Sequence, residues 1–368
     1  MNIPPTRAGS LALAALMPGG GASSGSAQIW SPEAARDALG DEYLVQQGLA
    51  PLWASLPADG NGTVSSPRAA DDALARCRTA AAAKYLLQRA ALAELDGAFD
   101  RAGIEYVVFK GAHVREWLYG DPALRDPADV DVLIHSDDSE LAVTTLLHAG
   151  FVPKVNLATV SHELILLRRG VEIDLHWHLM RPGRLRVDPS RQFLARRRRL
   201  AGLWTLSPTD AVFVMLVHPA FTKYVSSPAM SLIRAYDFLL AVGDRGVDWQ
   251  AVAALLDECG TRAAGWAVLS WFQMLHPVAY AVPADFAEQL RPGRIRVAYF
   301  RWWLQHDLPT RLHAAPLLVQ VGLTLALHDT ARDALRAVGC ILAARRDGTS
   351  HPVFRLAMDY DVGTGSPA

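Results

Sequence analysis

The sequence is poor in cysteine and has no long apolar run. Its 368 residues include three cysteines, Cys77, Cys259 and Cys340, which are isolated and form no CxxC pair. This spacing argues against a disulfide framework and against a thiolate zinc site, so a reducing cytoplasmic location fits best. No stretch approaches the roughly 18 apolar residues that a membrane-spanning helix requires, and we expect no membrane partner.

An excess of charge of one sign is also missing. The 36 Lys and Arg residues balance 37 Asp and Glu residues, giving a formal net charge of −1. Nucleic acid is therefore not an expected partner. The run Arg196–Arg199 is a local exception. A solvated connector between two domains is its plainer interpretation, and a grip on an acidic substrate is the alternative. The chain has no P-loop and no GxGxxG motif, which disfavours P-loop kinases and Rossmann dehydrogenases.

Breaker-rich stretches divide the chain. The Gly/Ser-rich segment Pro18–Ser26 follows the apolar run Leu11–Met17, which is too short for a signal peptide. A second such segment is Pro57–Pro67. These boundaries predict five parts: a flexible tail over 1–28, a helical segment with a loop over 29–74, a core over 75–180, a helical domain over 181–346 and a C-terminal tail over 347–368.

Strands and helices alternate in the predicted core. An Ala- and Leu-rich stretch from 68 to 100 has helical spacing of its apolar residues. Strands are expected at Ile104–Gly111, at Asp129–His135 and as a pair within His162–Leu179, with the turn near Arg169–Gly170. This order predicts an α+β core with a mixed sheet and flanking helices, followed by a mainly helical C-terminal domain.

Three carboxylates stand out in these strands. Asp129 and Asp131 are two residues apart, so a strand would point both side chains to one face. Asp174 lies in a later strand and would join them if the two strands are neighbours. Clustered carboxylates raise one another's pKa unless a cation neutralises them. Oxygen ligands suit Mg²⁺ or Mn²⁺, so the pattern predicts a divalent metal site; a solvated strand edge is the alternative.

A second group lies upstream. Lys110 and Gly111 end a predicted strand and begin a helix. Glycine lets backbone N–H groups approach a phosphate, a helix N-terminus favours an anion, and lysine adds a positive charge. Arg125 could also contact a triphosphate. The alternatives are a surface lysine at position 110 and a structural pair between Arg125 and Asp126 or Asp129.

The ordered phrases FKG, LYGDPALRDPADVDVLI and VEIDLHW resemble the DNA-polymerase-β-type nucleotidyltransferase superfamily. They are most similar to a family of uncharacterised bacterial nucleotidyltransferases that carries "KG", an arginine before an acidic D-h-D strand, and "[DE]-L-H-W". The later phrases LSPTDAVFVMLVHPAF and LIRAYDFLLAVGDRGVDWQAVAALLDECG are similar to the helical half of that family. The resemblance spans about residues 75–280.

The resemblance implies a Mg²⁺-dependent (or Mn²⁺-dependent) nucleotidyltransferase. It implies that Asp129 and Asp131 bind metal and that Asp174 binds metal and acts as the base. The donor would be a nucleoside triphosphate, held at Lys110 and Gly111, and pyrophosphate would leave. The acceptor would be a hydroxyl of a small molecule, a glycan or a peptide.

One departure from the superfamily pattern matters. Lys110–Gly111 stands where the superfamily commonly has Gly-Ser, so one hydroxyl contact with the triphosphate is missing. Lysine could replace it. The alternative function is a degenerate nucleotide-binding or partner-binding accessory protein, antitoxin-like, without turnover.

Three histidines need separate interpretation. In a strand, Asp174, His176 and His178 point the same way. We expect His176 to orient Asp174 from behind and His178 to cap the strand end. The alternative is a zinc face at His176 and His178, which would suit a zinc hydrolase. His218, in a predicted helix, is expected to be a packing residue.

Overall fold

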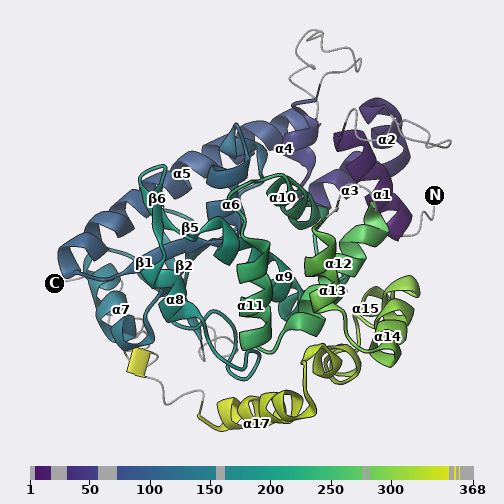
Figure 1. The fold of residues 1–368 in the computed structure, drawn as a ribbon. Coiled ribbons are helices and arrows are strands. Elements are labelled where there is room, and N and C mark those ends of the chain that lie inside the picture. The colour runs from purple at the N-terminus through teal and green to yellow at the C-terminus, as the bar shows by residue number, and fades with distance from the viewer. Residues whose placement is uncertain are drawn as a thin grey trace.

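A seven-stranded mixed sheet forms the centre of the protein, with helices on both sides and a helical C-terminal region (Figure 1). The coordinates are a computed structural model. They describe residues 5–17, 31–56, 73–154, 162–276, 280, 282–347, 352–353 and 356. The predicted α+β class is therefore confirmed.

The strand order in the sheet is β3-β4-β5-β2-β1-β7-β6. Strand β2 is parallel to β5 and β1 is parallel to β7, whereas the other neighbours are antiparallel. The strands are β1 (Tyr106–Phe109), β2 (Val130–Ile134), β3 (Val152–Lys154), β4 (Glu163–Arg168), β5 (Val171–His176), β6 (Arg198–Leu200) and β7 (Leu203–Thr205).

The β4–β5 hairpin confirms the strand pair predicted within His162–Leu179. Arg168 faces Val171 across a two-residue turn. Arg169 and Gly170 have φ angles of 50° and 78°. Two central residues with positive φ form the type I′ turn, whose twist matches that of paired strands. The turn thus fixes the register of β5, on which the candidate site depends.

Alternation along the strands separates two apolar cores. Val130, Val132 and Ile134 of β2 pack toward α5 and α7, together with Ile173 and Leu175 of β5. The intervening side chains point to the opposite face, which the helical half covers. The helices of the sheet region are α5 (Ala73–Ala102), α6 (Lys110–Leu118), α7 (Ser139–His148), α8 (Ser190–Ala195) and the short 3₁₀ turns η1 (Pro122–Leu124) and η2 (Ser136–Asp138).

The helical half packs around a larger core that includes Phe213, Phe238 and Phe272. Helix α9 begins as predicted, because the Ser207 side chain caps it and Pro208 occupies its first turn. The helices are α9 (Pro208–Thr222), α10 (Leu232–Val242), α11 (Trp249–Glu258), α12 (Arg262–Leu275), α13 (Ala284–Leu290), α14 (Arg294–Gln305), α15 (Leu308–Arg311), α16 (Pro316–Val319), η3 (Gln320–Thr324), η4 (Leu325–Leu327) and α17 (Ala331–Asp347).

The N-terminal region differs from its prediction. Residues 5–16 of the expected flexible tail form helix α1 (Pro5–Leu16), in which Ala12 and Leu13 are fully buried. The apolar run was too short for a membrane, yet it is long enough to cover α12. The segments Pro18–Ser26 and Pro57–Pro67 lie outside the described residues. The predicted helical segment contains α2 (Pro32–Leu39), α3 (Asp41–Gln46) and α4 (Ala50–Trp53).

The sheet extends beyond residue 180, where the core was expected to end. Strand β7 returns to the sheet and pairs with β1, and β6 pairs with β7. The arginine run includes Arg198 and Arg199 of β6, so it is part of the sheet and not the solvated connector between two domains that was expected. Its ion pairs are Arg196–Asp210 (2.6 Å), Arg197–Glu105 (2.8 Å) and Arg199–Asp96 (3.1 Å).

The C-terminal part of the helical domain expected over 181–346 is broken before α17. The Thr330 hydroxyl accepts a hydrogen bond from the Asp333 N–H and donates one to the Asp333 carboxylate, so a new helix begins there. Of the expected tail beyond α17, Val353 is fully buried against the sheet core. Within the described ranges, no helix is long and apolar enough to cross a membrane.

Candidate active site

The register of β2 and β5 brings two of the predicted carboxylates together. Asp131 and Asp174 are direct partners across this parallel pair. Both side chains point to the face covered by the helical half, where they line a cavity of about 320 Å³. Asp129, which precedes β2, lines the same cavity. The three carboxylates that the sequence singled out therefore face one cavity.

The three side chains differ in burial and in partners. Asp131 is 3% exposed, Asp174 is half-buried and Asp129 is exposed. The Oδ1 atom of Asp174 is buried and has no hydrogen-bond partner among the described residues. Arg168, which could have paired with Asp174, instead binds Glu94 at 2.6 Å. A buried carboxylate oxygen without a donor is costly, and a cation would relieve that cost.

The pKa shifts follow from this crowding. Burial, and then the charges of Asp131 and Asp129, raise the pKa of Asp174 to about 8. The charge of Asp131 raises the pKa of Asp129, and the partial loss of water around this side chain inside the cavity acts in the same direction. Burial acts in the same direction on Asp131, but Lys110 and His176 outweigh it and lower the pKa of that carboxyl. Asp131 is therefore anionic, whereas Asp174 lacks a compensating cation.

The sheet forms one wall of the cavity, which we call the sheet wall. On this wall Lys110 places a positive charge next to Asp131. Its Nζ donates to Asp131 Oδ1 at 2.5 Å and lies 3.4 Å from His176 Nε2. The side chain is 12% exposed, which excludes the surface-lysine interpretation. Its φ of 50° is left-handed and costs a non-glycine residue about 1 kcal/mol or more.

Gly111 is required by its neighbour Arg125. A Cβ at position 111 would collide with Arg125 Nη1. The Nε and Nη2 atoms of Arg125 bind the Asp237 carboxylate at 2.8–3.0 Å, and both residues are buried. Neither Asp126 nor Asp129 is therefore its partner. Arg125 links the turn after β1 to helix α10, and its Nη1 group faces Gly111.

His176 contacts a different carboxylate from the one expected. Its Nε2 lies 3.0 Å from Asp131 Oδ1, whereas Asp174 was the predicted partner. Residues 174 and 176 of β5 share one face, and Asp131 of β2, the register partner of Asp174, reaches the His176 ring diagonally across the two strands. His178 turns away and contacts Asp188 at 3.0 Å. A zinc face at His176 and His178 is therefore not formed.

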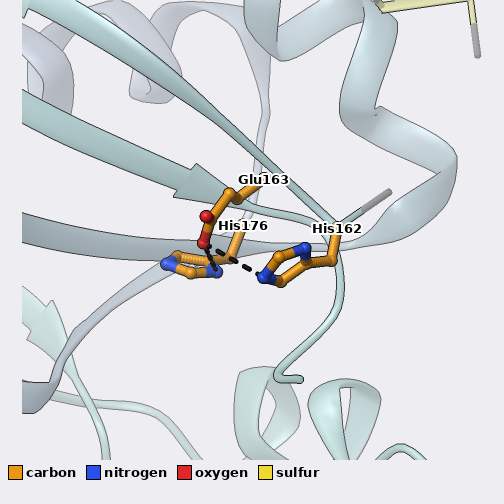
Figure 2. A group of neighbouring side chains, drawn as sticks. All are labelled: His162, Glu163 and His176. Atoms are coloured by element: carbon orange, nitrogen blue, oxygen red, sulfur yellow. Dashed lines mark ion pairs between the residues drawn. The ribbon is translucent and has the colours of Figure 1, made fainter. Parts of the chain in front are cut away.

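Two further residues at this edge were missed by sequence reasoning. His162 directly precedes β4, and Glu163 is the first residue of that strand and the cross-strand partner of His176. Figure 2 shows both imidazole rings turned toward the Glu163 carboxylate. Glu163 Oε2 lies 3.2 Å from His162 Nε2 and 3.3 Å from His176 Nδ1. The available signal was the HE pair at the start of the strand that faces VEIDLH in the hairpin.

A basic wall faces the carboxylates across the cavity. Four cations from outside the predicted motifs line it: Arg181, Arg184, Lys223 and Arg234. None has a carboxylate within ion-pair distance in the part of the chain that the structure describes. The Nε of Arg234 is buried without a hydrogen-bond partner there. Burial and the neighbouring Arg234 lower the pKa of Lys223. Unpaired, partly buried cations are typical of an anion-binding surface.

His218 also lines the cavity, from within α9. Its ring lies 3.2 Å from the Thr222 hydroxyl, one helical turn away. Burial, and then the charges of Lys110 and Arg234, lower its pKa well below the ordinary value. His218 is therefore also part of the cavity surface, in addition to the packing role that was expected.

The cavity therefore has carboxylates that can bind cations on one wall and positively charged side chains that can bind anions on the other. The sequence profile of a family described as "Uncharacterised nucleotidyltransferase" matches residues 41–275. This region runs from α3 to the end of α12 and includes both walls of the cavity apart from Gln320 of η3. No curated protein and no solved structure matches the chain. Because the family match covers well over half of the 368 residues, the chain belongs to this family of uncharacterised nucleotidyltransferases.

Proposed function

We propose that the protein transfers a nucleoside monophosphate from a nucleoside triphosphate to a hydroxyl acceptor, with Mg²⁺ or Mn²⁺ as cofactor. Family membership supports nucleotidyl transfer in general. The observation that carries the finer proposal is the pairing of Asp131 with Asp174 in register, with Asp129 in the same cavity. The acceptor we propose is a small molecule, a glycan or a peptide.

The carboxylates fit a hard divalent cation. Asp131 and Asp174 can each direct one carboxylate oxygen to positions within 4.8 Å of each other. The unpartnered Asp174 Oδ1 and the raised pKa of this group are what a missing cation would leave behind. Mg²⁺ held by Asp129, Asp131 and Asp174 would offset the negative charge that develops on the reacting phosphate and on pyrophosphate.

The chain's own residues then divide the work. Lys110 and the first N–H groups of α6 hold the phosphates at the Lys110–Gly111 turn. Lys223 and Arg234 attract the triphosphate from the opposite wall and stabilise the leaving pyrophosphate. Asp174 accepts the proton of the acceptor hydroxyl. The freed oxygen forms a bond with the α-phosphorus, while the bond from this phosphorus to the bridging oxygen breaks and pyrophosphate leaves.

Substitution of Asp131 tests this proposal. Asp131→Asn and Asp129→Asn should abolish pyrophosphate release from the preferred triphosphate while the fold survives. The assay offers each of the four common triphosphates with Mg²⁺ and a panel of sugars, nucleosides and peptides. Glu172→Gln is the matched control, because Glu172 lies on the adjacent strand β5, is half-buried outside the cavity lining and pairs with Lys154. Full activity in both aspartate variants would overturn the assignment.

A degenerate binding protein is the second candidate. Two observations favour it: Gly111 has no hydroxyl, and the Lys110 ammonium already binds Asp131. Calorimetric titration with ATP, GTP, CTP and UTP, with and without Mg²⁺, separates the two candidates. Tight binding without pyrophosphate release would support the second candidate, and release that requires Mg²⁺ would support transfer.

A further inference from the structure

The geometry points to a second metal site, in which His162, Glu163 and His176 bind one zinc-class divalent ion beside the carboxylate cluster. This site goes beyond the proposed function, because it uses different ligand atoms and a different chemical class of ion. It requires no nucleotide. Zinc binding can therefore be tested whether or not nucleotidyl transfer is found.

The three residues are brought together by the β4–β5 hairpin. Glu163 faces His176 across the strands, and His162 precedes Glu163 at the strand end. Their ligand atoms lie within 4.8 Å of one another, and both imidazoles approach the same Glu163 oxygen at 3.2 and 3.3 Å. Ligand atoms about 2.0–2.2 Å from a tetrahedral zinc ion are separated by similar distances. Small side-chain adjustments would therefore place all three around one ion (Figure 2).

His176 itself indicates that something is missing between it and Glu163. The ring is 2% exposed, and its Nδ1 is buried without a hydrogen-bond partner in the described ranges. A neutral imidazole has one N–H and one lone pair. We assign the proton to Nε2, because its closest contact, at 3.0 Å, is the acceptor Asp131 Oδ1. The Nδ1 lone pair then faces a carboxylate oxygen, which is unfavourable unless a cation lies between them.

The other contact of His176 also suits a metal ligand. Histidines that bind a metal through one nitrogen usually donate the other N–H to a carboxylate, which fixes the ring. Asp131 is placed to receive that bond. Asp131 would thus hold His176 toward this ion while it also faces the carboxylate site. Two imidazoles and one carboxylate favour Zn²⁺ over Mg²⁺, whereas the all-oxygen set of Asp129, Asp131 and Asp174 favours Mg²⁺.

The site is also open to a fourth ligand. All three residues line the cavity of about 320 Å³, so water or a substrate oxygen can reach the position that the protein leaves free. Three protein ligands with one open position are characteristic of zinc sites that act on a bound molecule. The further site is therefore accessible to the same compound that occupies the cavity.

Equilibrium dialysis of the chelator-treated full chain against Zn²⁺ tests the proposal. We expect one tightly bound ion per chain, detected by elemental analysis. His162→Ala and Glu163→Gln should weaken Zn²⁺ binding by more than the roughly 10- to 100-fold that loss of an outer partner costs. His178→Ala is the matched control, because His178 lies on the same hairpin but contacts Asp188, and it should bind Zn²⁺ like the unmodified chain. Unchanged Zn²⁺ affinity in His162→Ala would overturn the proposal.

A second measurement keeps the proposal testable if a variant fails to fold. Co²⁺ bound to the unmodified chain at this site should give the intense visible bands of four- or five-coordinate nitrogen ligation, which Zn²⁺ should displace and a large excess of Mg²⁺ should not. A faint octahedral Co²⁺ spectrum that Mg²⁺ removes would place the ion at the carboxylates instead and would contradict the His162–Glu163–His176 site.

Discussion

The two walls of the cavity are built in different ways. The sheet wall places Asp131 and Asp174 on adjacent strands, where a single register fixes their separation. The basic wall, which we call the helical wall, takes Arg184 from a loop, Lys223 from the end of α9 and Arg234 from the first turn of α10. A strand's period of two marks its functional residues in the sequence, whereas no local pattern marks cations that converge only through helix packing. The geometry of the sheet wall is therefore set by the pairing of two strands, and that of the helical wall by the packing of separate segments.

The largest expected effect comes from removing one carboxylate of the sheet wall. Asp174→Asn should lower kcat by about a thousandfold, which corresponds to about 4 kcal/mol, because both metal affinity and the base are lost. The same change removes a group that its anionic neighbours destabilise, so the midpoint of thermal unfolding should not fall. Parallel kcat and thermal-unfolding measurements check both. A loss of activity accompanied by a large loss of stability would indicate a structural role instead.

A smaller effect is expected on the helical wall. Arg234→Gln should weaken binding of a non-hydrolysable triphosphate with Mg²⁺ by about thirtyfold, since a charge-assisted hydrogen bond contributes about 2 kcal/mol. Calorimetric titration measures the dissociation constant. Arg191→Ala is a suitable control, because Arg191 is exposed and pairs with Asp137 on the surface. Equal affinity in Arg234→Gln and the unmodified chain would remove the helical wall from the nucleotide site.

The same contrast explains how much the sequence could predict. Alternation and turn residues were sufficient for β1, β2 and the β4–β5 hairpin, but not for the pairing of β2 with β5, on which the meeting of Asp131 and Asp174 depends. They were not sufficient for β6 and β7, which are three residues long each and too short to show a period. The partner of Arg125 is 112 residues away in α10, and only tertiary packing reveals that pair.

The tail prediction failed for a related reason. The Gly- and Ser-rich composition of residues 18–26 was extended to the preceding apolar run, whose burial depends on the distant helix α12. Likewise, the spacing of His176 from Asp174 suggested that these two residues interact. The His176 ring instead contacts Asp131 on the neighbouring strand β2. In each case the local pattern identified the element correctly or nearly so, while the partner was set by another part of the chain.

The next prediction concerns the Lys110–Gly111 turn, where one added methyl group tests how closely Arg125 packs against Gly111. Gly111→Ala should lower the free energy of unfolding by about 2 kcal/mol, because its Cβ would displace the Arg125 guanidinium from Asp237. Gly97→Ala is the control: Gly97 lies within α5, where a Cβ meets only Arg101 Nη1 at 3.4 Å, and alanine favours a helix. Urea unfolding measures both. Gly111→Ser should not raise turnover, although it supplies a hydroxyl at this turn, since the same collision occurs.

The smallest expected effect concerns His113 of α6 and its contribution to the pH dependence of stability. His113 is fully buried in α6, is stacked on Trp117 with ring centroids 5.6 Å apart, and has no hydrogen-bond partner for either nitrogen among the described residues. Burial, and then the charge of Arg198, lower its pKa to about 3. Between pH 6.5 and pH 3 the unfolded chain therefore binds a proton at this residue that the folded chain does not, so stability falls as the pH falls.

A phenylalanine at this position isolates the contribution of His113 from those of the other buried histidines. For a group with an unfolded pKa near 6.5, the loss of stability from pH 7.5 to pH 5.5 is about 1.4 kcal/mol. His113→Phe keeps a flat ring on Trp117 and loses no hydrogen bond, so its free energy of unfolding should decrease by that much less over the same interval. Urea titrations at the two pH values measure the difference between the proteins. Identical pH dependence would mean that His113 takes up a proton as readily in the folded state as in the unfolded state. That result would contradict the prediction made from its burial.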